Sequence, residues 1–170
     1  MSTDELSHRL AAVQLAAFDI DGVFTDGRFY LSDAGVESKA FCTLDGYGIR
    51  RALDAGIAVA VISGRQSRAV EIRMAELGVQ HVYLGCKDKV AVFETLLAQL
   101  KLQASQCAYT GDDVPDLPLL RRAGIAIAVA NAHPQVVAEC DFVTQWRGGY
   151  GAVRDVCDRL LAARDQPAPA

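Results

Sequence analysis

Four short polar motifs in the sequence carry residue types suited to chemistry on a phosphate monoester. They are DIDG from Asp19, SGR from Ser63, Lys89 at the end of CKDK, and GDD ending at Asp113, with Asp116 beyond it. A phosphate monoester is a dianion that repels a nucleophile, so its charge must be neutralised before attack. Mg²⁺ together with a lysine or arginine can do this, and Mg²⁺ prefers carboxylate and carbonyl oxygens as ligands.

Each motif can supply a different part of such a reaction. Asp19 can attack phosphorus and form an aspartyl-phosphate, which splits one difficult step into two easier ones. Asp21 can protonate the leaving alkoxide and later activate water. Asp19 and Asp112 are candidate carboxylate ligands for Mg²⁺. Ser63 offers a hydroxyl to a phosphoryl oxygen, and Lys89 offers positive charge.

Taken alone, each motif also has a structural interpretation. DxDG occurs in turns and calcium loops, and Ser63-Gly64 is consistent with a cap for a helix beginning near Ser67. Lys89 is consistent with an exposed helix-start residue, and residues 111–113 with a turn that caps a helix. Catalysis is favoured because all four motifs fall at expected strand ends or helix starts on one edge of a sheet, where α/β proteins bind ligands.

The hydrophobic pattern explains why these positions should share an edge. Brief runs that are apolar on both faces predict buried strands at 15–19, 58–62, 81–83, 107–110, 125–128 and 142–143. Between them lie three helical faces, formed by Val70, Met74 and Leu77, by Val90, Phe93, Leu97 and Leu100, and by Val153, Val156 and Leu160. Gly78 and Gly124 stand where helix stop signals belong. The alternation predicts an α/β fold with a doubly wound, mostly parallel, Rossmann-like sheet.

One segment breaks this alternation. Residues 28–42 read as two short strands around the turn-forming Asp33-Ala34-Gly35, which predicts a β-hairpin projecting from the sheet. No insertion is long enough to form a cap domain. We therefore expect a single domain over residues 1–164, followed by a disordered tail over 165–170.

Composition and charge narrow the class of protein. With 170 residues, 51% of them hydrophobic, the chain is suited to one globular core. A net charge of −4 argues against a nucleic-acid partner, and the apolar runs are too short to cross a membrane. The polar N-terminus resembles no signal peptide, and five scattered cysteines indicate reduced thiols. We expect a cytoplasmic protein without nucleic-acid or membrane partners.

The four motifs, in this order, resemble those of the haloacid dehalogenase superfamily of phosphohydrolases. The matching runs are DIDGVFTD, ISGR, the lysine of CKDK, and GDDVPD. The resemblance implies catalytic roles for Asp19 as nucleophile, Asp21 as acid and base, and Ser63 and Lys89 as the phosphoryl clamp. It implies Mg²⁺ on the side chains of Asp19 and Asp112 and the main-chain carbonyl of Asp21, with Asp113 and Asp116 supporting the metal site.

From about Leu15 to Leu161 the chain resembles the small lidless branch of this superfamily. The resemblance implies hydrolysis of 3-deoxy-D-manno-octulosonate 8-phosphate, a step in lipopolysaccharide precursor synthesis. It also implies a homotetramer in which the hairpins form a barrel and a neighbouring subunit covers each active site. Such a cover would exclude water in the absence of a cap domain.

Arg65 matches the branch members that act on octulosonate, and a guanidinium can grip a sugar carboxylate with two parallel hydrogen bonds. The residues that match substrate contacts are Thr43, Asp45, Gly46, Arg50, Gly64, Arg65 and Arg73. Another phosphorylated keto sugar acid or small phosphomonoester is the alternative substrate. A receiver-like module or an idle scaffold is the non-enzyme alternative, but receiver domains lack an acid/base carboxylate at the position of Asp21.

Overall fold

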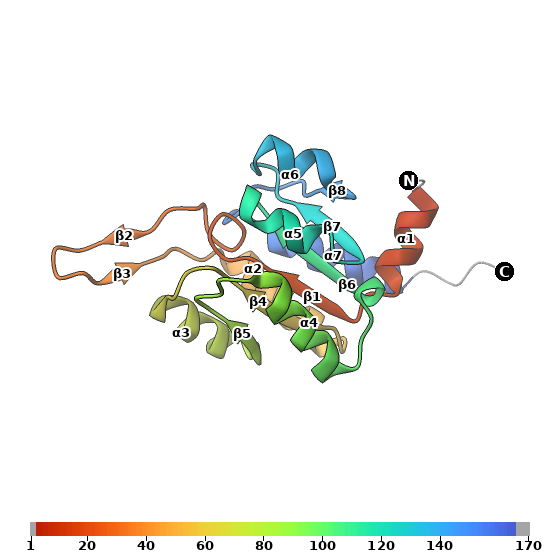
Figure 1. Cartoon of the computed structure of the whole chain (residues 1–170), viewed down its shortest axis with the longest axis horizontal. Coiled ribbons are helices and arrows are strands. Elements are labelled where there is room, and N and C mark those ends of the chain that lie inside the picture. The colour runs from red at the N-terminus through yellow and green to blue at the C-terminus, as the bar shows by residue number, and fades with distance from the viewer. Residues whose placement is uncertain (1–2, 166–170) are drawn as a thin grey trace.

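The computed structural model describes residues 3–165 and has a parallel sheet at its centre (Figure 1). Within that range the sheet has six strands in the order β5-β4-β1-β6-β7-β8, all paired in parallel. Their bounds are β1 Leu15–Phe18, β4 Ala58–Ile62, β5 His81–Tyr83, β6 Cys107–Gly111, β7 Ile125–Ala128 and β8 Phe142–Val143. The predicted fold class is confirmed, and the strand bounds differ from those expected by one residue at β1 and β6.

Helices cover both faces of the sheet because strand side chains alternate between the faces. Ala16 and Phe18 of β1 belong to one buried cluster, whereas Leu15 and Ala17 belong to the other. The first cluster is completed by α1 Thr3–Ala11, α2 Thr43–Asp54, α3 Arg68–Leu77 and α7 Ala152–Arg164. The second is completed by α4 Lys89–Leu100, α5 Leu117–Leu120 and α6 Pro134–Glu139. Two short 3₁₀ helices, η1 Ala104–Gln106 and η2 Val114–Asp116, flank β6.

The two glycines predicted as helix stops serve different purposes. Gly78 closes α3 with a left-handed φ of 80°, as expected. The prediction for Gly124 is wrong, because α5 already ends at Leu120. A Cβ at Gly124 would lie 2.5 Å from the carbonyl oxygen of Ala104, so this glycine permits a close backbone approach. Helices α1 and α6 were not among the predicted elements.

The predicted hairpin forms from β2 Tyr30–Leu31 and β3 Glu37–Ser38, which pair antiparallel. Figure 1 shows it reaching well beyond the sheet, on the side away from α1. Its apolar side chains Phe29, Tyr30, Leu31 and Val36 are exposed. Residues 166–170, most of the tail predicted to be disordered, lie outside the described residues. Between residues 3 and 165, no helix combines the length and apolar character needed to cross a membrane.

Candidate active site

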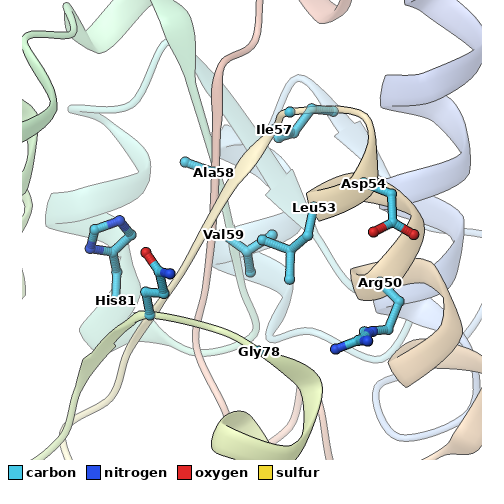
Figure 2. Close-up of a pocket in the computed structure, with 10 residues that line it drawn as sticks. Arg50, Leu53, Asp54, Ile57, Ala58, Val59, Gly78 and His81 are labelled. Atoms are coloured by element: carbon cyan, nitrogen blue, oxygen red, sulfur yellow. The ribbon is translucent and has the colours of Figure 1, made fainter.

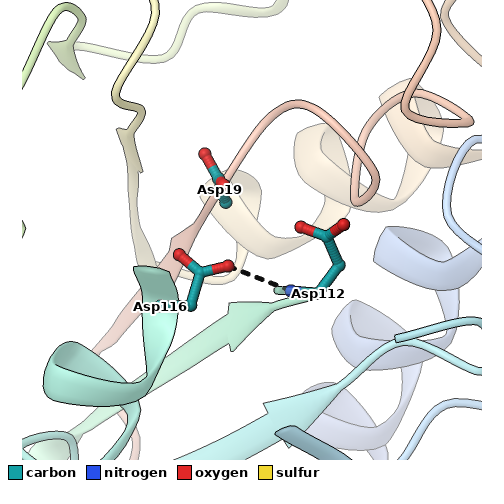
Figure 3. A group of neighbouring side chains, drawn as sticks. All are labelled: Asp19, Asp112 and Asp116. Carbon is teal, nitrogen blue, oxygen red and sulfur yellow. Dashed lines mark hydrogen bonds between the residues drawn. The ribbon is translucent and has the colours of Figure 1, made fainter. Parts of the chain in front are cut away.

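The first and fourth motifs meet because β1 and β6 are neighbours in the sheet. Phe18 is paired with Thr110, and the Asp19 N–H continues the ladder by donating to the Thr110 carbonyl at 3.0 Å. Asp19 and Asp112 therefore leave the sheet side by side, and Asp116 on η2 turns back toward both (Figure 3). One carboxylate oxygen from each of the three lies within 4.8 Å of the others.

The Asp116 carboxylate holds this acidic cluster together through four hydrogen bonds. Its Oδ2 accepts hydrogen bonds from the backbone N–H groups of Asp112, at 3.0 Å, and Asp113, at 3.4 Å. Its Oδ1 accepts from the buried Tyr109 hydroxyl, at 2.7 Å, and from Lys89 Nζ, also at 2.7 Å. The carboxylate thus fixes the turn that carries Asp112. The Asp113 side chain instead caps η2 by accepting from the Val114 N–H.

Lys89 begins α4 with its ammonium directed into the cluster. Asp88 caps the helix by accepting from the N–H groups of Val90 and Ala91, both at 3.0 Å. Lys89 Nζ lies 2.9 Å from Asp19 Oδ2, and only 12% of the side chain is exposed. Burial would lower the pKa of Lys89, but the carboxylates of Asp19 and Asp116 outweigh it and raise the pKa. The interpretation of Lys89 as an exposed helix-start residue is therefore wrong.

The electrostatics of the cluster fit a divalent cation. Burial raises the pKa of Asp19 to about 6, and the negative charge of Asp116 adds to the effect. Burial likewise raises the pKa of Asp112 to about 7, with further contributions from Asp116 and Asp19. One lysine does not balance three converging carboxylates, so bound Mg²⁺ would relieve the repulsion between them. The donor set consists of hard oxygen ligands, which suits Mg²⁺.

Gly22 allows the DIDG loop to pass directly over Asp112. Its φ is +90°, and a Cβ at this position would lie 2.0 Å from Asp112 Oδ2. Any larger residue would both strain the backbone and displace the Asp112 carboxylate. The glycine of the motif is thus required by the close approach of this loop to Asp112.

The second and third motifs join the first and fourth around one pocket of about 340 Å³. Its lining comprises Asp19, Asp21, Gly27, Ser63, Gly64, Arg65, Lys89, Asp112, Asp113, Pro115 and Asp116. Ser63, at the end of β4, is only 3% exposed. It does not cap α3: Ser67 occupies that position, and the Ser67 hydroxyl donates to Glu37.

The hairpin contributes charged residues that the sequence reasoning did not single out. Glu37 pairs with Arg65 at 2.8 Å, and the Arg65 guanidinium lies 4.1 Å from the centre of the Phe29 ring. Lys39 forms an ion pair with Asp21. Glu37 lies on β3 and Lys39 just after it, and their charged groups lie on the same side, 3.9 Å apart. The two charged residues at alternate positions, Glu37 and Lys39, were the only sign in the sequence that this part of the hairpin faces the site.

The predicted substrate residues on α2 and α3 lie outside this pocket. Thr43 opens α2, and Asp45 is only 1% exposed, with its Oδ1 accepting from the Arg154 N–H at 2.9 Å. Burial raises the pKa of Asp45 to about 6. Arg73 pairs with Glu76 at 2.8 Å and packs against Gly46.

Arg50 lines a different cavity, of about 440 Å³ (Figure 2). This cavity lies at the amino ends of β4 and β5, beside Ala58 and His81, and therefore at the edge of the sheet opposite the acidic cluster. Arg50 donates to the Leu77 carbonyl at 3.1 Å. Within one chain, Arg50 and Arg65 therefore line different cavities, and the substrate contact expected of Arg50 stays a prediction.

Comparisons with known proteins agree with this geometry. The model of the haloacid dehalogenase-like hydrolase family matches residues 84–154. The 3-deoxy-D-manno-octulosonate 8-phosphate phosphatase of Yersinia pestis is 44% identical over 163 residues, covering 96% of this chain and 87% of the relative. The enzyme of the same name from Escherichia coli strain K12 is 46% identical over 152 residues, covering 89% and 81%.

A solved structure adds ligands to this likeness. The 3-deoxy-D-manno-octulosonate 8-phosphate phosphatase of Moraxella catarrhalis, in complex with a magnesium ion, a phosphate ion and a KDO molecule, superposes with a TM-score of 0.94. It is 39% identical, and the alignment covers 96% of this chain and 94% of that one. The chain therefore belongs to the haloacid dehalogenase-like hydrolases and, among them, to the family of the 3-deoxy-D-manno-octulosonate 8-phosphate phosphatases.

Proposed function

We propose that the chain hydrolyses 3-deoxy-D-manno-octulosonate 8-phosphate to the sugar acid and phosphate. The observation that carries the proposal is the convergence of Asp19, Asp112 and Asp116 within 4.8 Å, with Lys89 Nζ 2.9 Å from Asp19. The identity of 44–46% to phosphatases of this name supports the substrate. The unit responsible is the domain over residues 1–164.

In this proposal, each catalytic residue has a distinct role. Asp19 attacks phosphorus, so that a bond from its carboxylate oxygen forms as the bond to the sugar oxygen breaks. Asp21 donates its proton to that leaving oxygen. Water then attacks the aspartyl-phosphate, returns a proton to Asp21 and releases phosphate from Asp19. Ser63 and Lys89 hold the phosphoryl oxygens throughout.

The metal would be held by the side chains of Asp19 and Asp112 and the main-chain carbonyl of Asp21. When bound, Mg²⁺ supplies positive charge to the phosphoryl oxygens. Asp116 supports the site by fixing the turn beneath Asp112, and Asp113 supports it by capping η2. Both supporting roles use contacts already made within the chain.

Recognition of the sugar acid is assigned to Arg65, with Gly64 leaving room beside it. Arg65 lines the pocket, and 47% of its side chain is exposed, so the guanidinium can reach a carboxylate of the substrate. Thr43, Asp45, Gly46, Arg50 and Arg73 lie outside the pocket, and a direct role in this chain's own site is not proposed for them.

The finer biological setting is part of the same proposal. We place the reaction in lipopolysaccharide precursor synthesis in the cytoplasm. The chain would act as a homotetramer, with the exposed apolar hairpins packed together and a neighbouring subunit covering each pocket. Light scattering that gave the mass of one 18.2 kDa chain at assay concentration would refute the tetramer.

The central test is Asp19→Asn. Because the amide cannot act as the nucleophile, phosphate release should fall by roughly 10⁴-fold or more. Asp54→Asn is the matched control, since Asp54 is exposed on α2 and lines the opposite cavity. Circular dichroism would show that both variants are folded. Undiminished turnover by Asp19→Asn would reject the nucleophile assignment.

A substrate panel separates the proposal from its alternatives. We expect kcat/KM to be highest for the octulosonate 8-phosphate, lower for other keto sugar acid phosphates, and lowest for aryl phosphates. Activity should vanish with EDTA and return with Mg²⁺. A single phosphorylation without turnover would indicate a receiver-like module, and complete inertness a scaffold.

A further inference from the structure

We propose that Lys39, at the base of the hairpin, is a positioning residue for Asp21. The inference rests on the proposed function, because it concerns how the acid and base of that reaction is held. Lys39 belongs neither to the four sequence motifs nor to the acidic cluster that would hold the metal. The hairpin would then serve the active site of its own chain, in addition to any contact with a neighbour.

The surroundings of Lys39 argue against a solvated surface lysine. None of its side chain is exposed, although it lies just after β3, on the returning arm of a long projecting hairpin. Its Nζ contacts Asp21 Oδ1, lies 3.9 Å from Glu37 Oε1 and 5.7 Å from the centre of the Phe29 ring. A buried ammonium is costly unless it is paired, so this enclosure ties Lys39 to the Asp21 carboxylate.

The two oxygens of Asp21 have different environments. Oδ1 accepts from Lys39. Oδ2 is buried and, within the described part of the chain, accepts no hydrogen bond, although it lies 3.4 Å from Arg65 Nε. Holding one oxygen fixes the plane of the carboxylate and leaves the other available to the proton that must move. A carboxylate held at one oxygen is positioned to exchange a proton with the substrate oxygen through the other.

Arg65 cannot provide the same anchor. Almost half of its side chain is exposed, and its Nη2 is directed to Glu37 at 2.8 Å. In the proposed reaction Arg65 must also be free to meet the sugar carboxylate. Lys39 is enclosed and has no such second task. Glu37 on β3 therefore holds Arg65, and Lys39, just after this strand, holds Asp21.

The test compares two kinds of leaving group in Lys39→Met. With a sugar or other alkyl phosphate, the leaving oxygen requires a proton, so kcat should fall on the order of 100-fold. With p-nitrophenyl phosphate, the phenolate leaves without that help, so the single-turnover burst of phenolate, which precedes the water step that Asp21 also serves, should slow only about 3-fold. KM should change little for either substrate. Lys39→Arg should restore most of the alkyl rate, since it retains the cation.

Arg28→Met is the matched control, because Arg28 is a hairpin cation that is 79% exposed and lies near Asp26 rather than Asp21. It should leave both rates unchanged. Equal losses on both substrates, or no rescue by Lys39→Arg, would show that Lys39 is merely structural and overturn the proposal. Unchanged kcat in Lys39→Met would also overturn it. With any of these three outcomes, turnover by the unmodified chain would keep the proposed function intact.

A second measurement does not depend on turnover. Urea unfolding of Lys39→Met, Asp21→Asn and the double variant forms a thermodynamic cycle for the pair. We expect the double variant to be less destabilised than the sum of the single variants, because either change already breaks the contact. Additive effects would overturn the proposal even if the unmodified chain showed no phosphatase activity.

Discussion

Asp19 in the pocket and Asp45 on α2 both have a pKa raised to about 6 by burial, yet their surroundings differ. Asp19 faces two further carboxylates and the Lys89 ammonium. Asp45 faces backbone N–H groups at the start of α7, including that of Arg154 at 2.9 Å. A raised carboxyl pKa therefore does not by itself identify a catalytic residue.

The two carboxylates differ in the kind of partner that their surroundings provide. Beside Asp19, like charges converge on one point, and a cation is the missing partner. Beside Asp45, the orphan N–H groups of a helix start are the partner, so the carboxylate serves as a structural link between α2 and α7. Chemistry should therefore respond to changes in the first region, and stability to changes in the second.

The largest effect that separates the two regions should come from Gly22→Ala. The added Cβ would be built 2.0 Å from Asp112 Oδ2, so the carboxylate must move by more than 1 Å. A displacement of that size should lower kcat/KM on the order of 100-fold or more. Steady-state phosphate release at saturating Mg²⁺ measures it.

Gly56→Ala is the control for backbone strain. Gly56 also has a positive φ, +76°, but a Cβ there meets nothing within 4 Å. The control should lose about 1 kcal/mol of stability and no activity. If Gly22→Ala behaved like Gly56→Ala, the close packing of the DIDG loop on Asp112 would not matter to the reaction.

A smaller effect is expected from Asp116→Asn. The amide can still accept from the Asp112 N–H, but a negative charge leaves the cluster and Lys89 loses its 2.7 Å partner. Affinity for Mg²⁺ should fall about 10- to 100-fold, as is usual when a supporting group is removed. Titrating Mg²⁺ against the melting temperature measures this affinity. Asp45→Asn, tested alongside, should keep the affinity of the unmodified chain.

Most of the fold could be predicted because its strands are apolar on both faces. The runs at 58–62, 81–83 and 125–128 have the predicted bounds, and the doubly wound order then places Asp19 beside Asp112. A run of consecutive apolar residues reflects burial on both faces of a strand, and such a run can be recognised directly in the sequence. Short or polar elements carry less of this signal, which explains why the six-residue α6 was missed.

The side-chain partners were harder to predict than the motifs. Lys39 reaches Asp21 only because of the path of the hairpin, and no local pattern specifies that path. The arginines show the opposite problem, since Arg50 matched a family position but points to the far edge of the sheet. Spacing along α2 indicates a shared helix face, whereas membership of a pocket depends on the direction in which the helix runs.

Stability as a function of pH should distinguish Asp45 from the pocket carboxylates. Its pKa in the folded chain, about 6, lies above the ordinary aspartate value of 3.8, so folding favours the protonated form. The resulting stabilisation is complete below pH 4 and is lost as the pH rises through 6. Relative to Asp45→Asn, the unmodified chain should lose roughly 2 kcal/mol between pH 4 and pH 7.

Urea unfolding of both chains across this range gives the difference directly, and titrations elsewhere in the molecule cancel. A difference that stayed constant with pH would mean that Asp45 has an ordinary pKa in the folded chain. An Asp45→Asn variant that also lost phosphatase activity would undermine the contrast drawn between the two regions.

The smallest effect should come from Gly46→Ala, the counterpart of Gly22→Ala on α2. A Cβ here would be built 2.4 Å from Arg73 Nη2, but that atom is the end of a flexible side chain and can move aside. Replacing a glycine within a helix by alanine gains up to about 1 kcal/mol of helix propensity, which offsets the adjustment. We expect a change in unfolding free energy within about 1 kcal/mol and unchanged kcat/KM. Because Arg73 must shift in this variant, a marked fall in kcat/KM would show that the residue acts on substrate, in the pocket of a neighbouring subunit.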